Sequence, residues 1–291
     1  MCYNSNAYVD TALPHGDQKM EQQSGLMQSG GGIRRILIRI AYDGTDYCGF
    51  QLQPNVMTIQ GAVEAALEEL AGEKITLTGG SRTDSGVHSR GNVAVFDTKL
   101  RIPAEKIPFA LNSRLPHDIV IQSAVETDPD FHPRHCDSLK TYEYVILNRR
   151  IDIPVLSRYA LYFPRPLDIS AMREAAKAFA GEHDFASFCS AGGVTETTVR
   201  RIDSISLTQD EDIFSDRLIR IRVTGNGFLY NMVRIMAGTL IDVGTGRIGA
   251  DTIPDIIAAC DRHMAGNTAP PQGLTHLSTV FMQSEHAGYN I

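Results

Sequence analysis

Residues 35–42 read Arg-Ile-Leu-Ile-Arg-Ile-Ala-Tyr, and their alternation decides the fold class. In a strand, the three isoleucines fall on one face and the two arginines on the other. Residues 217–224, Arg-Leu-Ile-Arg-Ile-Arg-Val-Thr, alternate in the same way. A strand buried in a parallel sheet would instead read as a continuous apolar run. We therefore expect an α+β protein with antiparallel sheets and helices on one face.

Further elements follow on both sides of these strands. The expected helices are 58–71, the segment after Asp168 up to Gly181, and 228–243. The expected strands are 74–77, 92–96, 141–147 and 199–207, with an extended segment from Ala269. We predict an N-terminal α+β domain at 33–138 and a C-terminal α+β domain at 139–291. The two halves could be repeats of one ferredoxin-like (RRM-like) unit, although no self-similarity in the sequence establishes this.

Residues 1–32 differ from the rest of the chain. They are rich in Gln, Ser, Asn and Gly and hold few apolar residues, which predicts a disordered N-terminal leader. Over the whole chain, 43% of the 291 residues are hydrophobic, enough for a large core. The most apolar stretch, 232–243, is broken by Arg234 and Asp242, so we expect no membrane span. Five scattered cysteines without a CxxC pair favour a reducing cytoplasm.

The charge balance bears on possible partners. The net charge of −7 argues against a broad nucleic-acid footprint, which normally appears as a basic domain. Arginines nevertheless recur in clusters, and five clusters in an acidic chain indicate a localised positive face. The clusters are Arg34-Arg35 with Arg39, His88 to Arg90, Arg149-Arg150, Arg200-Arg201, and Arg217 with Arg220 and Arg222.

The loop 80–91, Gly-Ser-Arg-Thr-Asp-Ser-Gly-Val-His-Ser-Arg-Gly, carries the most chemistry. A plain turn needs Gly, Asp and Ser, but it does not need the added arginines and histidine. Asp84-Ser85-Gly86 also matches the aspartic-protease signature. Such proteases need two carboxylates that share a proton, and one copy here would require a dimer. Residues 132–136, His-Pro-Arg-His-Cys, contain zinc-ligand residue types, but no second ligand pair follows at metal spacing.

The loop belongs to a longer series of motifs. In chain order they are Tyr42-Asp43-Gly44-Thr45-x-Tyr47-x-Gly49-Phe50-Gln51-x-Gln53, Ser81 to His88, Phe131-His132-Pro133-Arg134, Lys140 to Tyr144, His183-Asp184-Phe185-x-Ser187-Phe188, Phe228-Leu229-x-x-Met232-Val233-Arg234 and Ala269-Pro270-Pro271-x-Gly273-Leu274. Each motif is weak alone, but together and in this order the chain resembles the tRNA pseudouridine synthase A (TruA) family. The resemblance spans nearly all of 33–291.

The resemblance implies a reaction and a site. Family members isomerise uridine to pseudouridine at positions 38, 39 and 40 of tRNA, without metal or cofactor. Asp84 would be the essential carboxylate, either as a nucleophile or as the base that promotes elimination to a glycal. Arg234 would offset the rise in the pKa of Asp84 that burial causes. Tyr142 would stack on the flipped uracil, and Arg82 would fill the gap that the base leaves or bind its phosphate.

The resemblance also implies the setting of this site. The active site would lie in a cleft between the two halves, and the protein would act as a homodimer on tRNA. Candidate phosphate contacts are His88, Arg90, Arg149, Arg150, Arg220 and Arg222. Two other functions stay open at this point: a catalytically silent RNA-binding module or RNA chaperone on the same fold, and the dimeric aspartic protease.

Overall fold

The computed structural model describes residues 32–193, 195–211, 217–283 and 289. The predicted leader lies outside these residues, apart from Gly32. The strands are β1 (Arg34–Tyr42), β2 (Thr78–Gly79), β3 (His88–Thr98), β4 (Ile119–Thr127), β5 (Ser138–Leu147), β6 (Leu161–Tyr162), β7 (Gly181–Asp184), β8 (Val199–Glu211), β9 (Arg217–Gly225) and β10 (Leu274–Phe281). The helices are α1 (Ile59–Ala71), α2 (Ile107–Asn112), α3 (Ile169–Ala176), α4 (Met232–Gly244) and α5 (Ile253–Ala259).

The strands form one mixed sheet, which confirms the α+β class. Its path is β4-β1-β3-β10-β5-β9-β8-β7, with β2 on β3 and β6 on β5. The same connectivity occurs twice. Strands β1, β2, β3 and β4 with α1 and α2 form a β-α-β-β-α-β unit, and β5, β8, β9 and β10 with α3 and α4 form another. The strand order is β4-β1-β3-β2 in the first unit and β10-β5-β9-β8 in the second. In both units it is therefore fourth, first, third, second.

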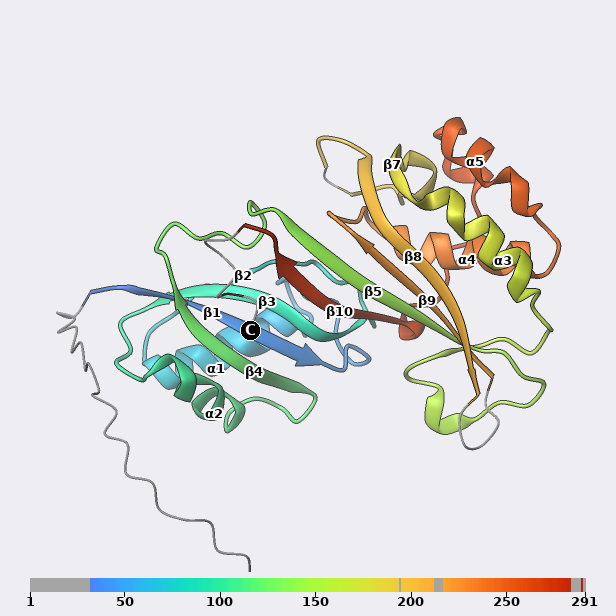
Figure 1. The fold of residues 1–291 in the computed structure, drawn as a ribbon. Helices are drawn as coiled ribbons and strands as arrows, with labels where there is room; N and C mark the ends of the chain where they lie inside the picture. The colour runs from blue at the N-terminus through green and yellow to red at the C-terminus, as the bar shows by residue number, and fades with distance from the viewer. Residues whose placement is uncertain (1–31, 194, 212–216, 284–288, 290–291) are drawn as a thin grey trace, which may run out of the picture. The chain divides into compact units, whose positions relative to one another are not determined.

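The two units join through a parallel pairing, which corrects the expectation of purely antiparallel sheets. Strand β10 pairs in parallel with β3, with Thr275 opposite His88 and His276 opposite Ser89. On its other side β10 pairs antiparallel with β5, so it lies between β3 and β5 (Figure 1). Side-chain alternation along a strand fixes its faces but not the direction of its neighbour. The join gives β10, an edge strand of the second unit, and the beginning of β3 backbone partners that they would otherwise lack.

Helix α1 begins and ends as its sequence predicts. Thr58 caps its N-terminus, and Gly72 ends it in the left-handed conformation. The strand expected at 74–77 does not form, and β2 follows as two residues only. The reason is local: Leu77 N–H donates to Glu64 Oε1, and the Leu77 carbonyl accepts from Gln60 Nε2. Side chains of α1 thus satisfy the backbone that a strand partner would have satisfied.

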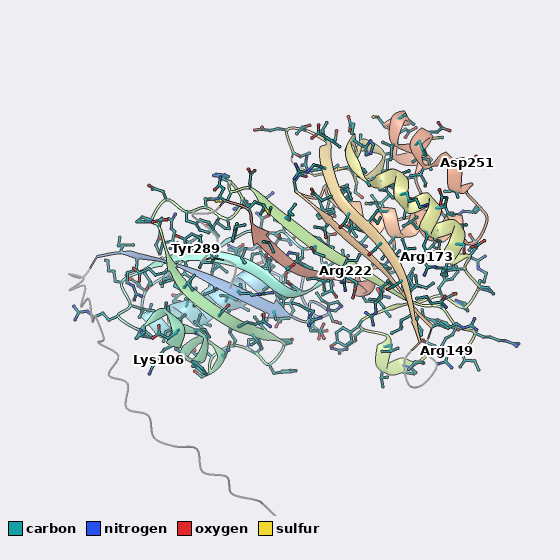
Figure 2. All side chains as sticks on the ribbon, in the orientation of Figure 1. Lys106, Arg149, Arg173, Arg222, Asp251 and Tyr289 are labelled. Carbon is teal, nitrogen blue, oxygen red and sulfur yellow. The ribbon has the colours of Figure 1, made fainter. Side chains whose placement is uncertain are left out.

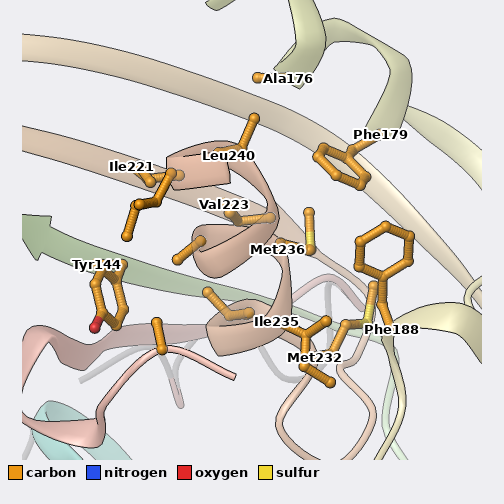
Figure 3. Packing of buried hydrophobic residues seen from close by; sticks show 14 of the residues in the cluster. Tyr144, Ala176, Phe179, Phe188, Ile221, Val223, Met232, Ile235, Met236 and Leu240 are labelled. Carbon is orange, nitrogen blue, oxygen red and sulfur yellow. The ribbon is translucent and has the colours of Figure 1, made fainter. Parts of the chain in front are cut away.

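Helix α4 is the most buried helix of the C-terminal unit. It begins at Met232, four residues later than expected, because Asn231 has a positive φ of 61° and cannot be part of a right-handed helix. Every residue of α4 is buried except Arg234. Figure 3 shows how Ile235, Met236 and Leu240 pack among the side chains of the sheet and of neighbouring segments. Arg234 is therefore the one α4 side chain that is free to serve a site.

Each unit has its own apolar core. Isoleucines 36, 38 and 40 of β1 pack with α1 and α2 in the first, and Tyr144, Ile146 and Ile221 pack with α3 and α4 in the second. The expected helix after Asp168 is α3, and the Asp168 side chain caps it. Cys48, Cys189 and Cys260 are free thiols. In the described part of the chain, no helix is both long and apolar enough to cross a membrane.

Candidate active site

The loop between β2 and β3 carries Asp84, and the segment after β1 holds that loop in place. Phe50 N–H donates to the Thr83 carbonyl at 3.0 Å, and Gly86 N–H donates to the Tyr47 carbonyl at 3.3 Å. A Cβ on Gly49, whose φ is +83°, would stand 2.7 Å from the Thr83 carbonyl. Only glycine allows this approach. The first motif of the sequence therefore supports the loop that carries the second.

Asn92 of β3 holds the start of the same loop. Its side chain is fully buried, accepts from Ser81 N–H at 3.2 Å and donates to the Ser81 carbonyl at 3.0 Å. The phenol of Tyr42 bonds Thr83 Oγ1 at 2.7 Å and accepts from Asn92 Nδ2 at 3.3 Å. Buried hydrogen bonds of this kind fix a backbone because each lost partner leaves a polar group unsatisfied. Asp84 thus projects from a rigid loop.

Asp84 meets Arg234, the pairing that the family resemblance implies. Arg234 Nη1 lies 3.4 Å from Asp84 Oδ2, and the two side chains are 15% and 20% exposed. Burial raises the pKa of the Asp84 carboxyl, while the Arg234 guanidinium acts in the opposite direction. The pair therefore provides a partly desolvated carboxylate with one fixed cation beside it.

Arg234 is itself held from two sides. Its Nε donates to the Ala269 carbonyl at 2.8 Å, and its Nη1 donates to Asn231 Oδ1 at 2.6 Å. Asn231 in turn donates to Ser190 Oγ at 2.9 Å. The left-handed residue that delays the start of α4 is thus also the residue that orients its arginine. The guanidinium faces Asp84 without needing to be reorganised.

A cavity of about 940 Å³ opens beside Asp84 and is lined by both units. Tyr142 of β5 lines it and is 8% exposed. Its ring packs edge-on against Phe228 at 5.0 Å and lies 4.8 Å from the ring of His276. Burial raises the pKa of the Tyr142 phenol, which stays protonated at neutral pH. With Asp84 and Tyr142 both in its lining, the cavity is large enough for a nucleotide.

The lining is positive although the chain is acidic. Four cations line the cavity, Arg82, Arg134, Lys140 and Arg200, against one carboxylate among the described lining residues, Asp84. The whole chain carries a net charge of −7. A positive cavity in an acidic protein attracts polyanions locally. This arrangement agrees with the positive face that the arginine clusters indicated, although most of those clusters lie elsewhere.

The structure does not bring His88 and Arg90 to the cavity. His88 is 3% exposed, and its Nδ1 lies 3.1 Å from both Gly44 N and Asp43 Oδ1. Its ring packs against Tyr159. His88 therefore contacts the turn after β1 and a loop of the second unit. Arg90 is exposed on β3, outside the lining.

The remaining arginine candidates also lie outside the lining. Arg220 and Arg222 of β9 bind Glu143 at 3.1 and 2.8 Å, on the face of β5 opposite Tyr142. Arg149 follows the C-terminal end of β5, as Figure 2 shows together with Arg222. Arg150 is the next residue, and its carbonyl accepts from Tyr162. Arg220 and Arg222 thus lie on the other face of the sheet from the cavity, and Arg149 and Arg150 lie beyond the far end of β5.

The structure offers little for the other chemistries. An aspartic-protease dyad needs a second carboxylate next to Asp84, and in the described lining Asp84 faces Arg234 instead. His132 and His135 stack on each other at 3.9 Å. In the residues that the structure describes, no group of three or more His, Cys, Asp or Glu side chains could hold a metal ion.

Sequence reasoning missed several residues of this site. Asn92 and Asn231 gave no local signal, because their partners lie across the fold. Lys140 did give one: it lies two residues before Tyr142 on the same strand, so both side chains point to one face. In the sequence, Arg200 stands out only as a member of the basic cluster Arg200-Arg201. Because alternate residues of a strand share a face, the sequence alone places Lys140 on the same face as Tyr142.

Comparisons with known proteins show which family the chain is similar to. A family model described as tRNA pseudouridine synthase matches residues 38–135 and 175–281. A tRNA pseudouridine synthase A of Caldicellulosiruptor bescii is 48% identical over 249 residues, 86% of this chain and 100% of that protein. The proteins of that name from Brevibacillus brevis and Thermoanaerobacter sp. are 45% and 43% identical over the same shares of both chains.

Solved structures add no weight. The chain resembles a chain of the crystal structure of the archaeal box H/ACA sRNP Nop10-Cbf5 complex at 11% identity, covering 83% of this chain and 46% of that one. The TM-score of 0.28 is too low to support a conclusion. The family model and the relatives matched over their full length are enough to assign the family: the chain belongs to the tRNA pseudouridine synthase family.

Proposed function

We propose that this protein is an isomerase that converts uridine to pseudouridine at positions 38, 39 and 40 of the tRNA anticodon stem-loop. One observation carries the proposal: Asp84 stands on a loop fixed by buried hydrogen bonds, beside Arg234, in a cavity that Tyr142 lines. In the reaction the bond from N1 to C1′ breaks and a bond from C5 to C1′ forms. N1 gains a proton and C5 loses one, so substrate and product are isomers and no co-substrate is consumed.

Asp84 acts first in this proposal. As a carboxylate it attacks the sugar or the base as a nucleophile, or it removes a sugar proton to give a glycal. Arg234 holds it ionised in a site where burial alone would favour the neutral acid. The fixed guanidinium also stays beside the carboxylate while charge shifts during the reaction.

Tyr142 receives the base. A uridine paired in a stem is beyond the reach of any carboxylate, so the base must leave the stack before its glycosidic bond is broken. In the cavity the uracil stacks on the Tyr142 ring, which packs against the rings of Phe228 and His276. Arg82, exposed at the rim, fills the gap left in the stem or binds its phosphate.

The two units contribute different parts of this site. We propose that they are two similar ferredoxin-like (RRM-like) domains, 33–138 and 139–291, with the active-site cleft between them. The repeated strand order supports this division. Asp84 comes from the first, and Tyr142 and Arg234 come from the second. The homodimer that the family resemblance implies and the cytoplasmic location that the scattered cysteines favour are part of the same proposal.

Mapping of pseudouridine on defined RNA tests the reaction. Unmodified tRNA transcripts with uridines at 38, 39 and 40 are incubated with the protein or with Asp84→Asn. Carbodiimide labelling and primer extension then locate the product. We expect pseudouridine at these positions with the protein and none with the variant. Binding of the transcript without any product from the unmodified protein would favour the silent RNA-binding module.

A further inference from the structure

The four cations that line the cavity have no acidic partner among the described residues, and two of them, Arg134 and Arg200, lie near Lys140. Arg134, Lys140 and Arg200 line the cavity together with Asp84. Within the described parts of the chain, none of the three forms a salt bridge, and Asp84 is engaged by Arg234. By contrast, several arginines outside the cavity form salt bridges with carboxylates at the surface. Lys140 and Arg200 are half-buried, and Arg134 is exposed. Half-buried charges are normally paired, so an unpaired group of like charges that includes two of them points to a ligand.

Lys140 is the innermost of the three. It lies on β5 between Gly225 of β9 and Thr279 of β10, and it is partly buried. Its Nζ donates to the Gly80 carbonyl at 3.1 Å, at the start of the loop that carries Asp84. An ammonium group has three donors, and this bond uses one of them. Lys140 thus touches the catalytic loop while keeping donors for a ligand.

The two arginines stand close enough to Lys140 to disturb it. Burial, and after it the charges of Arg134 and Arg200, lower the pKa of Lys140 to about 8. Arg200 is held in place by its own backbone: Nη1 donates to the carbonyls of Thr197 and Val199. Mutual repulsion of this kind costs stability, and an anion among the three would remove that cost.

We propose that Arg134, Lys140 and Arg200 bind the backbone phosphate of the nucleotide whose base enters the cavity. This inference rests on the proposed function and names part of its substrate contact. A flipped nucleotide carries its phosphate with it, so a base on Tyr142 brings an anion to the same cavity. Guanidinium groups and an ammonium group are the side chains that bind phosphate in proteins. The contact positions the sugar at Asp84 and reads no sequence.

Salt dependence of binding tests the proposal. The probe is an unmodified tRNA transcript, and all proteins carry Asp84→Asn so that no turnover occurs. Lys140→Gln and Arg200→Gln should each weaken binding about tenfold and lower the slope of log affinity against log salt by about 0.7 to 0.9. Lys177→Gln is the matched control, because Lys177 is exposed and pairs with Glu174 outside the cavity. It should leave both quantities unchanged.

The pH dependence gives a second readout. Below pH 8 Lys140 is protonated and binds phosphate; above pH 8 it must first take up a proton, so affinity falls by up to tenfold per pH unit. Lys140→Arg should remove this fall between pH 7 and 9. The charged and titratable groups around Lys140 are Arg82, Arg134, Arg200, His276, Tyr142 and Asp84. The pKa of His276 is lowered to about 3 and that of Tyr142 is raised, so neither titrates in this range.

Two results would overturn the proposal. If the two glutamine variants keep the affinity and the salt slope of the parent, the cations do not bind phosphate. If Lys140→Gln lowers only the turnover of the Asp84-containing enzyme, Lys140 merely positions the loop through Gly80. Thermal unfolding of each variant identifies any that fails to fold, and Lys140→Arg then carries the test. Failure of the proposed function is separate, because it appears as absence of pseudouridine with the unmodified protein.

Discussion

Two groups of basic side chains flank strand β5, and they differ in what neutralises them. On the open face, Arg220 and Arg222 share the carboxylate of Glu143. On the cavity face, Lys140 and its neighbouring arginines have no carboxylate partner among the described residues. In the sequence, both groups appear simply as lysine and arginine residues, and nothing local distinguishes them. The comparison shows that the absence of an internal acid, and not the number of cations, marks a surface prepared for an external anion.

The only carboxylate in the described cavity lining makes the comparison sharper. Asp84 does not neutralise the cavity cations, because Arg234 reaches it from α4. Glu143 on the opposite face is a structural acid that binds two arginines, whereas Asp84 is an acid with one cation and an open cavity in front of it. A carboxylate in the second situation is available for chemistry.

Replacing this carboxylate should have the largest effect. Asp84→Asn keeps the shape of the side chain but removes the nucleophile or base, so we expect turnover to fall at least about a thousandfold. Transcript binding should stay within a few-fold of the parent. Rates of pseudouridine formation measured under single-turnover conditions check this. Glu143→Gln on the opposite face is the matched change and should retain activity; an equal loss there would erase the contrast.

Removing the cation beside Asp84 should have the next largest effect. Arg234→Gln should lower turnover about a hundredfold, because a fixed charge at the reacting carboxylate is lost. It should also raise the pKa of Asp84 further, since burial then acts without opposition. Activity needs the ionised form, so it falls as pH drops through this pKa. The acid limb of the pH–rate profile should therefore move to higher pH, and an unchanged limb would contradict the pairing.

Loosening the loop should act more mildly. Asn92→Ala removes both hydrogen bonds to Ser81 and leaves buried groups unsatisfied, so we expect a loss of about 1–3 kcal/mol in the free energy of unfolding. Turnover should fall about tenfold while KM changes little, because Asp84 loses its fixed position. Urea unfolding and steady-state kinetics on the transcript measure both. Stability lost without any change in turnover would show that the clamp does not serve Asp84.

The smallest effect belongs to the open face. Arg222→Gln removes a cation that is already bound to Glu143, and the Arg222 side chain is 55% exposed. We expect the slope of log tRNA affinity against log salt concentration to change by less than about 0.3. Loss of a phosphate contact should change this slope by about 0.9. Filter binding at several salt concentrations distinguishes the two. A full loss of slope would mean that tRNA displaces Glu143 and that the two faces are equivalent.

The sequence predicts much of this protein and fails where distant segments meet. Alternation in 35–42 and 217–224 predicts their strands, and Thr58 with Gly72 predicts α1, because these signals are local. The parallel join of β10 to β3 has no local signal, and neither do the hydrogen bonds of Asn92. Asp84, Arg234 and Tyr142 come together as the family resemblance implies.

Charge patterns show the same limit. His88 and Arg220 look like phosphate ligands in the sequence because they are basic and lie near other basic residues. The structure buries the first against the turn at Asp43 and pairs the second with Glu143. Both partners are set by long-range packing and strand register. Lys140 is the reverse case: one lysine in a strand becomes a candidate ligand only once the cavity surrounds it.

The most direct test of the central claim follows the hydrogen that leaves C5. tRNA transcribed with 5-tritiated uridine is mixed with excess protein, and tritium released to water is counted over time. We predict one tritium released for each uridine modified at positions 38–40, with Arg222→Gln nearly as fast as the unmodified protein and Asp84→Asn silent. Release by Asp84→Asn at the parent rate, or no release by a protein that binds the transcript, would contradict the assignment of the chemistry to Asp84.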